Sequence, residues 1–360
     1  MTAAEILTEL VAIPTQQAGP DGISGDERRL CEHLAPMLRA RGADDVIVGD
    51  GVRTDGKPGA FVFARWGTPR RIINAHVDTV PANAGWTRDP WTPHLENGRL
   101  YGLGAADTKG AIAATLVALE QRPRNVGVLF SGDEEAGSAI MEAFLASPLA
   151  RGIEQAIVCE PTARIAGTSH RGVLGQHATI DGKGGHSSKA DFMPKPMVQL
   201  ARLAVALDDM GRARLHDGPA GMTGTCMNVA GFAGAVAFNV IPQRGRVDWS
   251  LRPYPGFDRD AWNRELARTA AAIDRDLVIE TTIDHAPFSC DALAELVRPH
   301  VARIGSLDFW TEAALYQAHG IDAIVVGPGD IGHAHAADEY VALEDLDWAV
   351  ELYARLLTAP

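Results

Sequence analysis

The feature that most constrains this chain is an alternation of short apolar runs with longer amphipathic stretches through its first 165 residues. Short apolar runs indicate buried strands, and the longer stretches between them indicate helices. The strand patterns lie at residues 61–64, 72–75, 126–130 and 156–159, with a helical pattern at 111–121. Strands that alternate with helices form largely parallel sheets covered on both faces. We therefore predict an α/β domain with a mostly parallel sheet flanked by helices.

A different pattern occupies the middle of the chain. Strand patterns enclose two helical patterns in the order strand, helix, strand, strand, helix, strand, which predicts a ferredoxin-like unit. These patterns lie at residues 173–180, 196–210, 225–232, 247–251, 258–273 and 277–283. The α/β pattern then returns, with a helix near 292–303, a strand at 323–326 and a closing helix at 343–357. We predict an α/β domain (residues 1–168 and 283–360) interrupted by an inserted α+β domain (residues 169–282).

Composition and charge exclude several classes of protein. The formal net charge is -13, and no cluster of Lys and Arg offsets it, so binding to nucleic acid or to an anionic membrane is disfavoured. No apolar stretch approaches the roughly 20 residues that cross a bilayer, and the N-terminal segment lacks a basic leader. The four cysteines form no Cys-x-x-Cys pair, which argues against a disulfide framework and against zinc held by thiolates. We expect a cytoplasmic enzyme.

Acidic and histidine side chains follow the apolar runs at the points where the predicted strands end. Because ligands bind outside the carboxyl ends of strands in a parallel α/β sheet, we expect these side chains to converge. A Gly/Ala-rich turn and a Gly-Pro-Gly turn carry further members of the set. The residues are His76, Asp78, Asp107, Glu134, Glu135, Glu160, His333 and His335.

The types of these side chains indicate metal chemistry. Any one of them after a strand is more often a turn or capping residue, but together they offer nitrogen and oxygen ligands without cysteine. This ligand set suits zinc, cobalt or manganese, and particularly two ions bridged by one carboxylate. Glu134 and Glu135 are adjacent, and two neighbouring carboxylates after a buried strand repel each other unless cations or solvent compensate.

Five motifs built on these residues resemble those of the dinuclear-zinc amidohydrolases, the family that includes acetylornithine deacetylase and succinyl-diaminopimelate desuccinylase. The resemblance covers nearly the whole chain and implies a zinc-exopeptidase-like fold with an inserted domain. The motifs are His76-Val77-Asp78, GLGAADTKG around Asp107, Asp133-Glu134-Glu135, Cys159-Glu160-Pro161-Thr162 and Ala334-His335 followed by Ala-Ala-Asp-Glu-Tyr340.

The resemblance implies two zinc ions, with cobalt or manganese as possible replacements. Asp107 would bridge the ions, His76 and Glu160 would bind one of them, and Glu135 and His335 would bind the other. The sequence His-Ala-His also offers His333, so that residue stays an alternative to His335. A cis peptide bond between Asp107 and Thr108 is expected from the same resemblance.

Three residues would carry out or support the catalytic steps, again by resemblance. Glu134 would be the general base, and Asp78 would orient the imidazole of His76. His186, in the Gly-Gly-His motif at 184–186, would donate a hydrogen bond to the oxyanion. His186 would come from the inserted domain of a neighbouring subunit, so this domain would serve as a lid and as the interface of a homodimer.

The substrate predicted by the resemblance is a small N-acyl amino acid. Asn239 and Arg252 match positions that bind a substrate carboxylate, and the backbone N–H groups of Gly327 and Gly329 are candidates for the same carboxylate. Glu312 is a candidate substrate-side group in Trp310-Thr311-Glu312-Ala313. This segment is closest to deacetylases that act on N-acetylornithine or N-acetylcitrulline, which would place the enzyme in arginine biosynthesis.

Alternative functions remain open from the sequence. Within the same family, the chain could be a succinyl-diaminopimelate desuccinylase, a metallo-dipeptidase or a carboxypeptidase. A non-catalytic metal-binding protein is an alternative of another class, although the presence of both Glu134 and His186 argues against it. A nucleic-acid-binding module has the least support, because the chain lacks a basic stripe or a stacking motif.

Overall fold

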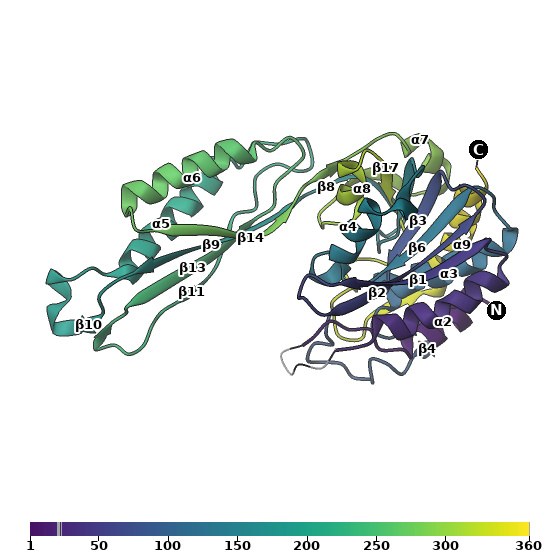
Figure 1. Cartoon of the computed structure of the whole chain (residues 1–360), viewed down its shortest axis with the longest axis horizontal. Helices are drawn as coiled ribbons and strands as arrows, with labels where there is room; N and C mark the ends of the chain where they lie inside the picture. The colour runs from purple at the N-terminus through teal and green to yellow at the C-terminus, as the bar shows by residue number, and fades with distance from the viewer. Residues whose placement is uncertain (20–21, 23, 360) are drawn as a thin grey trace. The chain divides into compact units, whose positions relative to one another are not determined.

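The computed structural model describes residues 1–19, 22 and 24–359, and this part of the chain divides into two compact units (Figure 1). The first unit comprises Met1–Thr168, Cys290–Gly305 and Thr311–Pro360, and the second comprises Ser169–Ser289 and Ser306–Trp310. The second unit therefore continues past residue 282, where we had placed the end of the inserted domain.

A mixed sheet forms the centre of the first unit. Its principal strands are β1 (Asp45–Val52), β2 (Pro58–Trp66), β3 (Arg71–His76), β6 (Val126–Ser131), β7 (Gln155–Val158), β8 (Ile165–His170) and β17 (Asp322–Val325). They follow the order β1-β2-β6-β3-β7-β17-β8. The four central strands β6, β3, β7 and β17 are parallel, whereas β1, β2 and β8 pair antiparallel at the edges. The predicted mostly parallel sheet is thus confirmed, with its parallel strands at the centre and antiparallel strands toward the edges.

Helices cover both faces of this sheet. The principal core joins the sheet to α1 (Ala3–Val11), α2 (Glu27–Ala40), α3 (Gly110–Ala118) and α9 (Leu343–Thr358). In β2 the side chains alternate, so that Val62 and Ala64 belong to this core while Phe63 contacts Phe144 of α4 (Ala139–Ala146) on the opposite face. Figure 1 shows α2, α3 and α9 on one side of the sheet, with α4 and α8 (Ala313–Ala318) on the other. No helix among the described residues is long and apolar enough to cross a membrane.

One predicted helix is wrong. Residues 292–303 form only the short helix α7 (Ala294–Val297) and a 3₁₀ turn, after which the chain enters the strand β16 (Arg303–Leu307) beside β8. Pro299 lies within that segment, and because proline has no backbone N–H it cannot donate the hydrogen bond that would continue α7. The first unit also holds a small antiparallel sheet of β4 (His94–Glu96), β5 (Arg99–Tyr101) and β18 (Tyr340–Ala342).

The second unit has the predicted ferredoxin-like order of elements. Its antiparallel sheet has the order β11-β13-β9-β14, and its core includes side chains from both helices. The elements are β9 (Val173–Asp181), α5 (Pro196–Arg212), β11 (Asn228–Ala233), β13 (Arg244–Leu251), α6 (Arg259–Ile273) and β14 (Val278–His285). Two short strands, β10 (Gly185–His186) and β12 (Val240–Ile241), pair apart from this sheet. Strand β15 (Phe288–Ser289) pairs with the end of β8. The predicted fold class is confirmed.

Candidate metal centre

The carboxyl ends of the four parallel strands supply most of the candidate site. His76 is the last residue of β3, and Glu134 and Glu135 lie in a turn that follows β6. Glu160 comes shortly after β7, and His335 lies in the loop that follows β17. Because parallel strands end at the same edge of a sheet, these four segments meet although they are far apart in the sequence.

Asp107 enters the site from a turn that a buried carboxylate holds in place. The backbone N–H groups of Gly104, Ala106 and Asp107 donate to the Glu339 carboxylate at 3.0, 2.9 and 3.1 Å. The peptide bond between Asp107 and Thr108 is cis, which confirms that expectation. Thr108 Oγ1 in turn donates to the backbone oxygen of His76 at 2.9 Å, so this turn is tied directly to the end of β3.

The side chains form two groups of potential metal ligands that share Asp107. Ligand atoms of His76, Asp107 and Glu160 lie within 4.8 Å of one another, and so do those of Asp107, Glu135 and His335. His76 Nε2 is 2.9 Å from Asp107 Oδ1, and His335 Nε2 is 3.3 Å from Asp107 Oδ2. His335 Nε2 is also 3.0 Å from Glu135 Oε1. Each group offers nitrogen and oxygen donors that suit a divalent ion such as zinc, so the residues present fit a pair of cations bridged by Asp107.

The electrostatics of these groups also favour cations. Burial, together with the neighbouring Glu160, raises the pKa of Glu134 well above its ordinary value, although His76 acts in the opposite direction. The pKa of Glu160 is likewise raised by burial and by Asp107 and Glu135, against the effect of His76. Hydrogen bonds to Asp107 and Glu135 raise the pKa of His335 to about 10. Positive charge is therefore favoured at the centre of this cluster, because several carboxyl groups share a region with little solvent.

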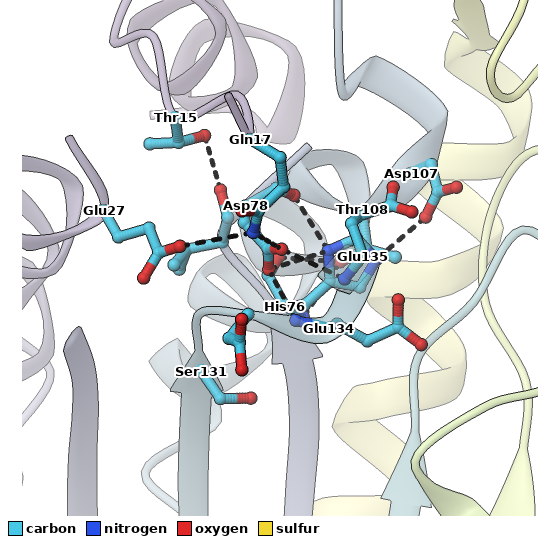
Figure 2. Close-up of polar contacts among 12 residues, drawn as sticks. Thr15, Gln17, Glu27, His76, Asp78, Asp107, Thr108, Ser131, Glu134 and Glu135 are labelled. Atoms are coloured by element: carbon cyan, nitrogen blue, oxygen red, sulfur yellow. Dashed lines mark hydrogen bonds and ion pairs between the residues drawn. The ribbon is translucent and has the colours of Figure 1, made fainter. Parts of the chain in front are cut away.

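The carboxylate of Asp78 holds the acidic turn, which carries Glu134 and Glu135 (Figure 2). Its carboxylate accepts the backbone N–H of Glu134 at Oδ1 and that of Glu135 at Oδ2, both at 3.1 Å. His76 Nδ1 is 2.9 Å from the backbone oxygen of Asp78 and 3.6 Å from Asp78 Oδ1. The backbone carbonyl of Asp78 is therefore the nearer partner of the imidazole. The carboxylate of Asp78 acts mainly on the turn that carries Glu134 and Glu135.

His333 does not lie with the ligand groups. Its Nε2 is 2.8 Å from the hydroxyl of Tyr340, and the two rings lie against each other with centroids 4.2 Å apart. His335, two residues later, has a positive φ of 55° and directs its imidazole toward Asp107 and Glu135. Of the two histidines in the His-Ala-His sequence, His335 is the one beside the carboxylates.

Three predicted residues lie in the second unit. His186 in β10 pairs with Val240, and the backbone N–H of Ser187 donates to the oxygen of Asn239 at 3.0 Å, so His186 and Asn239 are neighbours. Both line one cavity of about 770 Å³. Arg252 follows the last residue of β13, whereas Arg244 at the other end of this strand lines that cavity. His186 and Asn239 are thus brought together, and Arg252 is at the opposite end of β13.

The remaining predicted residues lie in the first unit but have little open surface. Glu312 is 1% exposed, and Ser131 Oγ is 3.4 Å from Glu312 Oε2. The N–H of Gly327 donates to Thr162 Oγ1 at 3.2 Å, so it is not free for a substrate carboxylate as we had expected. Gly329 has a positive φ of 86°, and an added Cβ would lie 3.0 Å from Ala106, so close packing explains the need for glycine there.

The sequence reasoning assigned no role to three buried residues around the site. Glu339, which holds the Asp107 turn, belongs to the Ala-His-x-x-Asp-Glu motif and could have been found from it. Gln17 donates to Asp78 Oδ2 at 2.6 Å, and Glu27 accepts the N–H of Ala60 at 3.2 Å. Both precede the recognised motifs, and a lone Gln or Glu in that segment carries no local signal of its partners.

Comparison with known proteins identifies a family of peptidases and relatives that are deacetylases. A model of peptidase family M20/M25/M40 matches residues 72–359. The chain is 32% identical to an N-acetyl-L-citrulline deacetylase of Xanthomonas campestris, over 98% of this chain and 96% of that protein. It is 28% identical to an acetylornithine deacetylase of Proteus mirabilis, over 99% of this chain and 96% of that protein. The fold is similar to that of an M20 family metallo-carboxypeptidase of Sulfolobus solfataricus, with a TM-score of 0.76, 19% identity, and coverage of 99% of this chain and 98% of that chain.

Proposed function

Because this chain belongs to peptidase family M20/M25/M40, we propose that it is a metal-dependent amidohydrolase that removes the acetyl group from N-acetylcitrulline or N-acetylornithine. The observation that carries the proposal is the shared position of Asp107 in two groups of potential ligands, with the half-buried Glu134 beside them. Full-length similarity to deacetylases of these two amino acids supports the substrate class. Such a reaction would belong to arginine biosynthesis.

In this proposal, His76, Asp107 and Glu160 hold one cation, and Asp107, Glu135 and His335 hold the other. Zinc is the ion we expect, with cobalt or manganese as replacements. Bound there, the two ions would supply Lewis-acid polarisation of the acyl carbonyl and of the attacking water. Glu134 is not needed as a ligand in either group, which leaves its carboxylate available for proton transfer.

Glu134 is the proposed general base. Its carboxylate would take a proton from the attacking water and then deliver that proton to the leaving nitrogen of the amino acid. Two features support this role. The backbone N–H of Glu134 donates to Asp78 Oδ1 at 3.1 Å, and the Glu134 carboxyl group interacts electrostatically with His76 and Glu160. Positioning of this kind matters because proton transfer requires the base within hydrogen-bond reach of the water.

His186 is the proposed hydrogen-bond donor to the oxyanion. The backbone N–H of Ser188 donates to His186 Nδ1 at 3.2 Å, so Nδ1 is an acceptor and the neutral ring carries its proton on Nε2. The side chain is exposed in β10, which leaves the Nε2–H free to reach a substrate. We propose that this N–H stabilises the negative charge that develops on the acyl oxygen.

The second unit would also bind the substrate carboxylate and form the homodimer. The strand β13 has eight residues, which corresponds to roughly 25 Å, so His186 and Asn239 at one end and Arg252 near the other cannot contact one small substrate from a single copy. This separation supports a site shared between two subunits, in which one chain supplies His186 and Asn239 and the other supplies Arg252. Glu312 and Gly327 are less suited to contact the substrate, because Glu312 is buried and the N–H of Gly327 is already engaged.

A steady-state assay tests the proposal directly. The zinc-loaded protein is offered N-acetylcitrulline, N-acetylornithine, N-succinyl-diaminopimelate and a dipeptide, and kcat/KM is compared across the four. We expect the highest kcat/KM for one of the two acetylated substrates, loss of turnover on chelation and its return on adding zinc. The Glu134→Gln variant should lose about 100-fold or more in kcat while still binding zinc.

The same assay separates the alternatives. Preference for the succinylated substrate or for the dipeptide would replace the deacetylase by the desuccinylase or the peptidase. Binding of zinc without turnover of any of the four would favour a non-catalytic metal-binding protein. Equal kcat for wild type and Glu134→Gln would remove Glu134 from the mechanism.

A further inference from the structure

A segment near the N-terminus runs alongside the loop that carries Asp78. Gln16 forms a parallel bridge with Thr79, and the backbone N–H of Gln17 donates to the oxygen of Thr79 at 2.7 Å. The hydroxyl of Thr15 donates to the oxygen of Val77 at 2.6 Å. These contacts join residues more than 60 positions apart in sequence and bring the side chain of Gln17 to the rear of the candidate metal centre.

The Gln17 side-chain amide lies between two buried carboxyl groups (Figure 2). Its Nε2 donates to Asp78 Oδ2 at 2.6 Å and is 3.5 Å from Glu27 Oε1. Asp78 Oδ2 also accepts the backbone N–H of Glu135, and Asp78 Oδ1 accepts that of Glu134. A rotation of the Asp78 carboxylate would disturb both hydrogen bonds to the turn, and the hydrogen bond from the Gln17 amide opposes such a rotation.

Glu27 supports the same arrangement from the other side. Its Oε1 is 3.4 Å from Arg53 NH1, and its Oε2 accepts the backbone N–H of Ala60 at 3.2 Å. The carboxylate also packs against the backbone of Gly132, where an added Cβ would lie 2.0 Å from Glu27 Oε2. Gly132 precedes the acidic turn, so Glu27 lies against both the start of that turn and the Gln17 amide.

We propose that Gln17 is a positioning residue of the metal centre: its amide holds the Asp78 carboxylate in the orientation that accepts the N–H groups of Glu134 and Glu135. This inference rests on the proposed hydrolase function for its kinetic consequence. Gln17 is 7% exposed, and its side-chain amide contacts Asp78 and Glu27, neither of which is a proposed ligand. Its effect passes through Asp78 to the general base Glu134 and to the ligand Glu135.

The neighbouring Gln16 offers a matched control. It lies in the same segment, is 6% exposed, and its Oε1 has no hydrogen-bond partner among the described residues. Substitution of either glutamine by leucine keeps a similar side-chain volume and removes the amide. The pair Gln17→Leu and Gln16→Leu therefore separates loss of the contact to Asp78 from a general change in the packing of this segment.

The experiment compares three properties of the full-length protein: kcat and KM in the deacetylase assay, the zinc dissociation constant from competition with a chelator, and the thermal midpoint of the metal-free protein. For Gln17→Leu we expect kcat to fall and zinc binding to weaken, each by about tenfold or more, with KM nearly unchanged. For Gln17→Glu, which has nearly the same shape, we expect a larger loss because a carboxylate would face Asp78. For Gln16→Leu we expect kcat and zinc affinity close to wild type.

The readouts keep this inference separate from the proposed function. If the wild type turns over substrate and the two variants Gln17→Leu and Gln16→Leu have the same kcat and the same zinc affinity, Gln17 has no positioning role. The proposed hydrolase function would stand in that case. If the wild type hydrolyses none of the substrates, the proposed function fails, and zinc affinity alone decides whether Gln17 positions the turn. If Gln17→Leu shows no thermal unfolding transition, it fails to fold. In that case kcat and zinc affinity of the nearly isosteric Gln17→Glu are compared with those of Gln16→Leu, and equal values would overturn the positioning role.

Discussion

Glu312 carries a carboxyl group with 1% of its surface exposed, close to the charges of His76 and Asp78. Burial raises its pKa from the ordinary 4.5 to about 7, with His76 opposing and Asp78 adding to the rise. The side chain was a candidate for contact with the substrate, but it is enclosed by the protein, which points to a different role. In the metal-free protein, Glu312 is a buried acid that is easier to accommodate when it is protonated.

This residue predicts a pH dependence of stability. A folded-state pKa above the unfolded value means that the stabilising contribution is complete below pH 4.5 and is lost as pH rises through about 7. Between pH 5 and pH 8, the free energy of unfolding of the metal-free wild type should therefore fall more than that of Glu312→Gln. The difference has an upper limit of about 3 kcal/mol.

Urea unfolding of both proteins at the two pH values, with a chelator present, measures this difference. Groups that do not interact with Glu312 contribute equally in the two proteins, so the difference reports Glu312 together with its interactions with His76 and Asp78. The same pH dependence in both proteins would show that Glu312 does not ionise in this range.

At the residue scale, the predictable part of the site was the part that follows strands. His76, Glu135 and Glu160 could be proposed because each comes after a recognisable apolar run, and a parallel sheet brings such positions to one edge. Gln17 and Glu27 could not, because their partners Asp78 and Ala60 are distant in sequence and nothing local marks them. The N–H of Gly327 was a candidate for the substrate carboxylate, because the sequence does not reveal that Thr162 Oγ1 already accepts it.

At the scale of elements, the turn from Gly104 to Asp107 depends on Glu339. One carboxylate accepts three backbone N–H groups there, and Glu339 is 2% exposed. Both carboxylate oxygens of Glu339 accept hydrogen bonds: Oε1 accepts from Ala106 and Asp107, and Oε2 accepts from Gly104. The geometry of the proposed bridging ligand is therefore set by a residue from another segment of the chain.

Substitution of Glu339 tests this dependence. Glu339→Ala leaves buried donors without an acceptor and should reduce the free energy of unfolding by about 2 kcal/mol or more. It should also weaken zinc binding, because the turn that presents Asp107 loosens. Glu339→Gln keeps one acceptor oxygen, so its losses should be smaller. Chemical unfolding and chelator competition measure the two effects, and equal zinc affinity in wild type and Glu339→Ala would contradict the proposed link.

Helices and strands with a regular spacing of apolar residues were predictable. Those stabilised by contacts with residues distant in sequence were not. The closing helix α9 and the helices α5 and α6 match their predicted ranges to within two residues, because their apolar positions recur at helical spacing. β1 was not predicted. It contains Gly49 and Gly51, where an added Cβ would lie 2.3 Å from Phe61 and 2.4 Å from Ile140, so tertiary packing rather than local preference favours a strand there.

At the scale of the whole molecule, the second unit places His186 with Asn239 and leaves Arg252 near the other end of β13. A site shared by two subunits predicts complementation between inactive variants. When His186→Ala and Glu134→Gln chains form a heterodimer, one of its two sites combines an intact Glu134 with an intact His186. Random mixing should restore about a quarter of wild-type activity.

Each variant assayed alone provides the control, since neither homodimer contains a complete site. Native mass spectrometry establishes whether heterodimers are present in the mixture. Heterodimers without activity would mean that each active site is built within a single chain. The sequence cannot decide this point, because the order of elements within one chain does not determine which copy completes the site.

The central claim is that His76, Asp107, Glu135, Glu160 and His335 hold two cations with Asp107 between them. Anomalous diffraction at the zinc absorption edge, from crystals of the zinc-loaded protein, tests it most directly. The claim predicts two anomalous peaks per chain, one contacted by His76 and Glu160, the other by Glu135 and His335, with an oxygen of Asp107 on each. A single peak, or peaks that Asp107 does not contact, would contradict it.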